Sequence, residues 1–266
     1  MTKSQHWYDR DGKAVFEVPK AKGGGMRATT IADARKLGLY PSVTTVLCVL
    51  AKPQLVDWQL GQVAGKAYTN PPQDGESQED YARRIISASQ EQVGEAADLG
   101  TQIHAAIEAH FKGEPVAEEM QVYVRPTVAA LENAGIKLLE HELRLVNTEL
   151  GYAGTTDAVM VDAAGIEGIL DFKSRKTKPG QKCEPWETEP MQIAAYSAAK
   201  FGEETDWSTV ESTLIQPHGA NVYISTTEPG RVEIVRYNYK DINAAWTAFC
   251  AALELWQHLK GYRPPT

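Results

Sequence analysis

The sequence predicts an α/β fold of the α+β kind, in which helices and strands alternate along one chain. An apolar hairpin is expected near the middle, at residues 155–173, and helical spacing dominates residues 53–133 before it. A long amphipathic helix is expected at residues 241–260, close to the end. Because 266 residues suffice to bury a full core, we expect one large domain, residues 41–266, after an N-terminal extension of residues 1–40.

The overall charge and the cysteines exclude several classes of protein. A formal net charge of −8 argues against coating nucleic acid by bulk electrostatics, although a local basic groove stays compatible with it. Cys48, Cys183 and Cys250 lie far apart without a C-x-x-C pair, which argues against an iron–sulfur cluster, an all-cysteine zinc site and a disulfide framework. No eighteen-residue apolar stretch and no apolar leader occur, so we expect a cytoplasmic protein without membrane contact.

The N-terminal part offers one short strand and one capped helix. Residues 14–18 are expected to be extended, before a glycine-rich basic turn at residues 20–25. Ser42 or Thr44 is placed to cap a helix that continues toward Leu50. Hydroxyls and amides at a helix start can also hold a phosphate, so both residues are candidate phosphate contacts as well as caps.

Helical spacing then dominates. Helices are expected at residues 53–69, 79–92, 96–112 and 119–133, with a polar loop at residues 70–78 and a strand at residues 142–148. His104 and Glu108 lie four residues apart on one helix face beside an apolar stripe. A lone histidine on a helix is compatible with a structural role and with metal binding.

The hairpin carries the residues with the clearest chemistry. If Gly165 takes the left-handed position of a three-residue turn, Asp162 pairs with Ile166, and counting back places Asp157 opposite Asp171. Side chains alternate along a strand, so Lys173 points the same way as both carboxylates. Facing carboxylates repel unless a positive charge lies between them, and hard oxygen donors suit Mg²⁺ or Mn²⁺.

A simpler interpretation is that these carboxylates lie on a solvated sheet face and that Lys173 balances their charge. Against it, Ile169, Leu170 and Phe172 make the second strand apolar on both faces. We therefore expect the charged residues to line a cleft, where a carboxylate needs a partner.

A dense basic run follows the hairpin, and it is either a solvated loop or a loop that contacts phosphates. Its members are Lys173, Arg175, Lys176, Lys178 and Lys182. A helix is expected at residues 189–201, with Gln192 and Tyr196 on one face. Strands are expected at residues 211–216, 221–226 and 232–237, and the apolar stripe of the helix at residues 241–260 indicates core packing.

Five short motifs stand in one order along the chain. They are G-T-x-x-H at residues 100–104, Glu142, G-x-x-D at residues 154–157, D-x-K at residues 171–173 and Q-x-x-x-Y at residues 192–196. Together they resemble the PD-(D/E)XK nuclease superfamily in its RecB-like branch, and most closely the mitochondrial genome maintenance exonucleases and related phage and bacterial exonucleases. The resemblance covers residues 40–200, including a P-S-V-T segment at residues 41–44.

This resemblance implies a restriction-endonuclease-like core, with a central mixed sheet flanked by helices, extra N-terminal helices and a single nuclease domain at residues 41–266. It implies that His104, Asp157, Asp171 and the carbonyl of Phe172 bind one or two Mg²⁺ or Mn²⁺ ions. Catalytic roles are implied for Lys173, Glu142, Gln192 and Tyr196 beside the two aspartates. Relatives with an iron–sulfur staple use four cysteines, which this chain lacks.

The resemblance implies a metal-dependent DNA exonuclease that hydrolyses phosphodiester bonds from single-stranded or duplex ends, in phage or bacterial recombination, repair or end processing. The expected location is a bacterial or phage-infected cytoplasm, and a recombination or single-strand-annealing protein is a candidate partner. The expected DNA contacts are Ser42, Thr44, Arg175, Lys176 and Lys178. The alternatives are an inactive DNA-binding scaffold, a structure-specific endonuclease and an RNA-directed nuclease of the same fold.

Overall fold

The computed structural model describes residues 5–202 and 218–266, and these divide into two compact units. One unit combines the N-terminal part, up to Val49, with the chain from Gln121 to the end. The other spans Leu50–Met120. Neither division falls at the expected boundary at residue 40, and the two units are described separately below.

The N-terminal part of the first unit is built from short pieces. They are β1 (Trp7–Tyr8), β2 (Glu17–Pro19), β3 (Met26–Ala28), α1 (Ile31–Leu37), β4 (Tyr40–Pro41), α2 (Val43–Val46) and the 3-10 turn η1 (Leu47–Val49). β1 pairs with β4, and β2 pairs with β3. The strand expected at residues 14–18 lies later, at β2, and Ala14 instead forms a single bridge with Tyr8.

Part of the N-terminal segment packs into the core of this unit. The Trp7 side chain is fully buried, and its ring lies 6.0 Å from that of Trp256 and 6.3 Å from that of Tyr262. The sequence does not predict this packing. A strand as short as β1 shows no periodicity, and its partner β4 lies more than 30 residues away along the chain.

We therefore expect Trp7→Ala to lower the free energy of unfolding by about 3–5 kcal/mol, the usual effect of truncating a buried tryptophan. Urea denaturation followed by far-UV circular dichroism measures the change. Phe16→Ala is the control, because that side chain is 38% exposed and its loss should matter less. Equal stability of Trp7→Ala and the wild type would contradict this account of the N-terminal segment.

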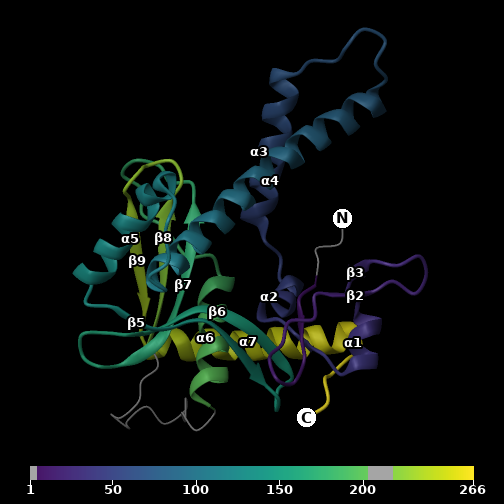
Figure 1. Cartoon of the computed structure of the whole chain (residues 1–266). Coiled ribbons are helices and arrows are strands. Elements are labelled where there is room, and N and C mark those ends of the chain that lie inside the picture. The colour runs from purple at the N-terminus through teal and green to yellow at the C-terminus, as the bar shows by residue number, and fades with distance from the viewer. Residues whose placement is uncertain (1–4, 203–217) are drawn as a thin grey trace. The chain divides into compact units, whose positions relative to one another are not determined.

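A five-stranded mixed sheet forms the centre of the first unit (Figure 1). Its strands are β5 (Lys137–Asn147), β6 (Tyr152–Val161), β7 (Glu167–Arg175), β8 (His218–Ser225) and β9 (Val232–Tyr237), in that order across the sheet. β7 and β8 are parallel, and every other neighbouring pair is antiparallel. The predicted mixed α/β class is thus confirmed, while the strand expected at residues 211–216 lies outside the described residues.

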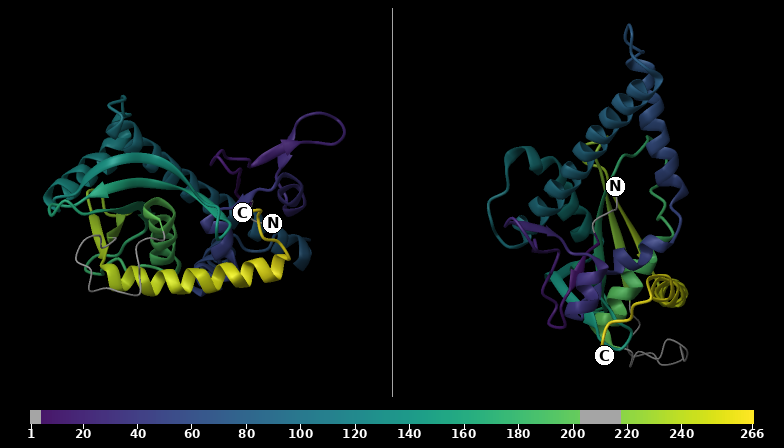
Figure 2. Two further views of the ribbon diagram at one scale, coloured as in Figure 1. Left: turned by 90° about the horizontal axis from the view of Figure 1, so that it is seen from below. Right: turned by 90° about the vertical axis from the view of Figure 1, so that its right-hand side faces the viewer.

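Helices α5 (Gln121–Asn133), α6 (Thr188–Phe201) and α7 (Tyr239–Lys260) pack around this sheet. Figure 2 shows α6 between the strands and α7. α7 begins at an Asn238 capping box and ends at Gly261 in the left-handed conformation. Its predicted core stripe is confirmed, since Ile242, Phe249 and Trp256 are buried.

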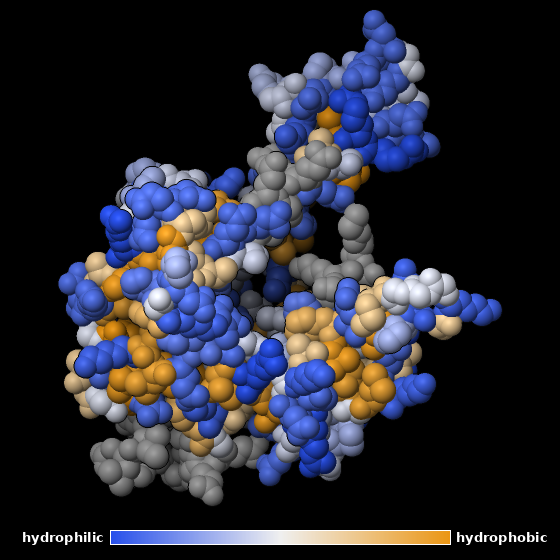
Figure 3. Space-filling view, in the orientation of Figure 1, coloured by the Kyte–Doolittle hydropathy of each residue, from blue (hydrophilic) through white to orange (hydrophobic). Residues whose placement is uncertain are grey.

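The second unit is a helical hairpin of α3 (Pro53–Thr69) and α4 (Gln78–Phe111), followed by the 3-10 turn η2 (Glu118–Met120). The predicted break between residues 92 and 96 is wrong, because α4 runs through it without interruption. Gly94 lies in this stretch. One glycine inside a helix costs only about 1 kcal/mol, which the rest of a long helix can offset. The loop that joins α3 to α4 is hydrophilic (Figure 3).

Among the helices of the described residues, none combines the length and the apolar character needed to cross a membrane.

Candidate active site

The β6–β7 hairpin adopts the register that the sequence predicts. Gly165 has a φ of +80°, and the amide of Asp162 donates to the carbonyl of Ile166 at 3.0 Å. The ladder then runs to the pair Ala158 and Leu170. Asp157 and Asp171 are the next residues along the two strands, so the turn chemistry alone brings them to neighbouring positions.

The Asp157 carboxylate reaches across to the neighbouring strand. Its Oδ2 accepts a hydrogen bond of 2.7 Å from the backbone amide of Phe172. A side chain thus serves as the acceptor for this amide just where the backbone pairing of β6 and β7 ends, at Ala158. The contact holds Asp157 against the peptide that follows Asp171.

Lys173 joins β7 to α6. Its Nζ lies 2.6 Å from Oδ2 of Asp171 and donates to Oε1 of Gln192 at 3.0 Å. The Asp171 side chain is only 5% exposed and that of Lys173 is 25% exposed, so the solvated-face interpretation does not hold for this pair. Burial lowers the pKa of Lys173, but Asp171, Asp157 and Glu189 together outweigh it, and the pKa is raised.

The ring of Tyr196, on α6, packs against Gly154 of β6. A Cβ atom added to Gly154 would lie 2.6 Å from Cε1 and 2.9 Å from the hydroxyl of Tyr196. Gly154 is therefore needed for the ring to approach the strand, which explains the glycine of the G-x-x-D motif. Burial raises the pKa of Tyr196, so its phenol stays protonated.

We expect Gly154→Ala to lower the free energy of unfolding by about 1–3 kcal/mol, because the added methyl overpacks a buried contact. Thermal and urea unfolding measure the change. Gly61→Ala is the matched control: on α3 an added Cβ meets no described atom within 4 Å, and the variant should be slightly more stable. A stability of Gly154→Ala equal to or above that of the wild type would show that Tyr196 does not occupy this position.

Glu142 has an unusual backbone. It lies on β5 with a φ of +48°, the left-handed region that a non-glycine residue seldom adopts. His141 and Leu143 pair with Ala158 and Thr156, so Glu142 stands across from Asp157. The predicted acidic residue thus neighbours Asp157 in the sheet, and Asp171 lies one strand further on.

His104 lies on α4, in the second unit, where its neighbours Ile103 and Ile107 are buried as the apolar stripe predicts. Its role as a metal ligand stays a prediction. Among the described residues, no group of three or more His, Cys, Asp or Glu side chains is arranged to hold a metal ion. Asp157, Asp171 and Glu189 are carboxylates of the first unit that act on Lys173, and Asp171 is the one in direct contact with it.

The Arg175 side chain makes contacts within the protein. Its guanidinium binds the Glu189 carboxylate at 2.6 Å and the Glu184 carbonyl at 2.6 Å, and it lies over the rings of Trp186 and Tyr223. The structure therefore places this predicted DNA contact in a role that anchors the loop after β7 to α6.

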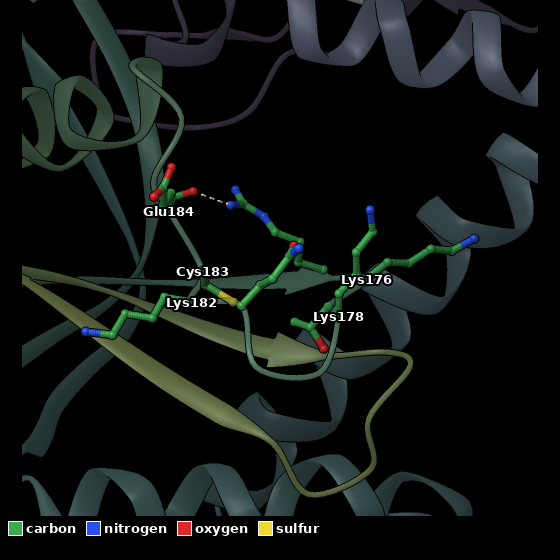
Figure 4. A pocket seen from close by; sticks show the side chains of 8 residues that line it. Lys176, Lys178, Lys182, Cys183 and Glu184 are labelled. Atoms are coloured by element: carbon green, nitrogen blue, oxygen red, sulfur yellow. Dashed lines mark hydrogen bonds between the residues drawn. The ribbon is translucent and has the colours of Figure 1, made fainter.

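The rest of the basic loop surrounds a cavity of about 180 Å³ (Figure 4). The side chains of Lys176, Lys178 and Lys182 spread in different directions from it and do not converge on one point. Lys176, Lys178 and Lys182 are all exposed. They suit contacts with a long, charged backbone better than the binding of one small anion.

Ser42 caps α2 as predicted. Its Oγ accepts a hydrogen bond of 3.0 Å from the amide of Thr45, and the residue is 3% exposed. Thr44 is exposed, with its hydroxyl 3.0 Å from that of Ser42. Thr44 is thus the member of this pair that solvent can reach.

Two buried polar groups beside the site do not belong to any predicted motif. Glu189 accepts from the Tyr223 hydroxyl at 2.6 Å, and Asn221 donates to Oδ2 of Asp171 at 3.2 Å. A polar asparagine within the apolar run of β8 was a signal that the sequence offered. Its partner could not be read from the chain, because the parallel pairing of β7 and β8 joins segments 50 residues apart.

Comparison with known proteins adds little to this description. No protein-family model matches the chain, and no curated protein matches it. A solved structure described as "Crystal structure of SSO0001" is similar at 14% sequence identity, over 76% of this chain and 86% of that chain, with a TM-score of 0.33. A likeness of this size carries no argument about fold or function.

Proposed function

We propose that this chain is a metal-dependent deoxyribonuclease of the PD-(D/E)XK type, with a restriction-endonuclease-like core, that hydrolyses phosphodiester bonds from DNA ends. The observation that carries the proposal is the contact of Asp157, Asp171, Lys173 and Gln192 around one short stretch of β7. These residues belong to three of the five motifs and come from two strands and a helix.

The donor set fits a hard divalent cation. Asp157 and Asp171 offer carboxylate oxygens, which Mg²⁺ and Mn²⁺ prefer. The site also accommodates positive charge, because the Lys173 ammonium lies directly against the Asp171 carboxylate. Asp157, Asp171 and the Phe172 carbonyl are the residues of this unit that would hold the ion, and His104 is the further proposed ligand.

In this proposal the cation supplies Lewis-acid chemistry, which acidifies water and relieves charge on the phosphate. The protein supplies position. Gln192 holds the Lys173 ammonium, and Tyr196 packs α6 onto β6 through Gly154. The pKa of Lys173 is raised, so its ammonium is placed to orient the attacking water or to stabilise charge on the phosphate, and either role requires Nζ to stay beside Asp171.

Contacts with DNA are proposed for Lys176, Lys178 and Thr44, all of which are exposed. Ser42 and Arg175 have structural roles. Ser42 caps α2, and Arg175 anchors the loop that carries the lysines. Local basic residues on a chain of net charge −8 fit an enzyme that binds DNA at one site.

The test is digestion of DNA that carries a label at the 5′ or the 3′ end, as single strand, as duplex and as closed circle, with Mg²⁺ or Mn²⁺. We expect linear DNA to be degraded and circular DNA to stay intact, and the label release gives the polarity. Cutting of the circle would show an endonuclease. Binding without cutting of any substrate would contradict the proposal and favour a scaffold.

A further inference from the structure

Asn221 lies directly beside Asp171 in the sheet. The parallel register of β7 and β8 pairs the two residues, and Nδ2 of Asn221 donates to Oδ2 of Asp171 at 3.2 Å. The same nitrogen lies 3.4 Å from the Asp171 carbonyl oxygen. Asn221 is 0% exposed and Asp171 is 3% exposed, so bulk water does not compete for this contact.

Tyr237 decides which way the Asn221 amide faces. Its hydroxyl donates to Oδ1 of Asn221 at 2.7 Å from the neighbouring strand β9. An amide has one acceptor and one donor end, so a phenol that donates to the oxygen turns the nitrogen toward Asp171. Burial raises the pKa of Tyr237, which keeps its proton available for donation.

The Asp171 carboxylate is therefore fixed from inside the sheet. Asn221 and Lys173 both contact its Oδ2, one from β8 and one from further along β7. A ligand that is held by its own hydrogen bonds needs no reordering when an ion arrives, and loss of such supporting contacts typically weakens metal binding about 10–100-fold.

We propose that Asn221 and Tyr237 are positioning residues, which hold the Asp171 carboxylate in the orientation that binds the divalent cation. Tyr237 acts through Asn221, and Asn221 acts on Asp171. This inference rests on the proposed function, because it assigns Asp171 as a ligand.

The test measures binding of Mn²⁺ alone to the intact protein by isothermal titration calorimetry, without DNA. Tyr237→Phe removes only the hydroxyl, and we expect the dissociation constant for Mn²⁺ to rise about 10–100-fold. Asn221→Ala should have at least that effect, and adding Tyr237→Phe to it should change nothing further. The raised metal requirement should also appear in activity as partial rescue by excess Mn²⁺.

Tyr262→Phe is the matched control. That hydroxyl also donates from a buried position, to the carbonyls of Leu39 at 2.8 Å and Ala34 at 3.0 Å. A purely structural role for Tyr237 would lower the melting temperature in both variants and leave Mn²⁺ affinity unchanged in both.

Asp171→Asn distinguishes failure of the positioning role from failure of the metal site. If Asp171→Asn weakens Mn²⁺ binding and Tyr237→Phe does not, the positioning role is overturned and the proposed metal site stands. If the wild type fails to bind Mn²⁺, or Asp171→Asn binds it equally well, the metal site fails and the positioning role fails with it.

Discussion

Lys173→Ala should lower the rate of DNA hydrolysis about 10²–10⁴-fold, the usual contribution of a positioned proton-transfer or charged group. The side chain is held in one place by Asp171 and Gln192. The change removes a charge from a partly exposed side chain, and the fold should persist.

Single-turnover digestion of labelled linear DNA at saturating Mg²⁺ measures this effect. Melting temperatures establish that the variant is folded. Lys36→Ala is the control, because it removes one positive charge from an exposed position on α1. A rate for Lys173→Ala equal to that of Lys36→Ala would remove Lys173 from the proposed mechanism.

Asp171→Asn should have an effect of similar size. The substitution keeps the shape of the side chain but removes the charge that attracts both the cation and Lys173. Lewis-acid assistance to phosphoryl transfer amounts to several kcal/mol of transition-state stabilisation, so its loss corresponds to about a 10³-fold slower reaction.

The measurement follows the rate against Mg²⁺ concentration for the wild type and for Asp171→Asn. We expect the variant to need more Mg²⁺ and to stay slower at saturation. Asp11→Asn, an exposed residue of the loop after β1, serves as the charge-matched control. A Mg²⁺ dependence of Asp171→Asn identical to the wild type would argue against a ligand role for Asp171.

Local patterns predicted the centre of the site well. The turn at residues 162–165 sets the register of β6 and β7, and turn chemistry is legible from glycine and aspartate positions alone. Strand alternation then places Lys173 on the same face of β7 as Asp171, and the structure confirms this with a direct contact. Gln192 also contacts Lys173, through the helical spacing that was expected for α6.

Features that depend on contacts between distant segments could not be predicted from the sequence. Trp7 packs against Trp256, and Arg175 is anchored by Glu189 and Tyr223, although a run of basic residues suggested a phosphate contact. Such contacts arise from tertiary packing, which overrides local composition. Glu142 could be expected near the aspartates, but its positive φ has no counterpart in the sequence.

The continuous helix α4 is another feature that local sequence patterns did not predict. The helices expected from the sequence leave a gap between residues 92 and 96, where Gly94 lies, and glycine weakens a helix. The capped start at Ser77 and the buried Ile103 and Ile107 stabilise the helix on either side of that point. Whether a helix continues depends on the sum of these contributions and not on one residue.

The central claim is that Asp157, Asp171 and Lys173 form a metal-dependent nuclease site. The most direct measurement is the release of labelled nucleotides from linear DNA by the purified wild type with Mg²⁺, with EDTA, and with EDTA followed by excess Mg²⁺. We predict release with Mg²⁺, none with EDTA, and recovery when Mg²⁺ is restored, with release by Lys173→Ala about 10²–10⁴-fold slower. DNA that stays intact under every condition, or release by Lys173→Ala at the wild-type rate, would contradict the claim.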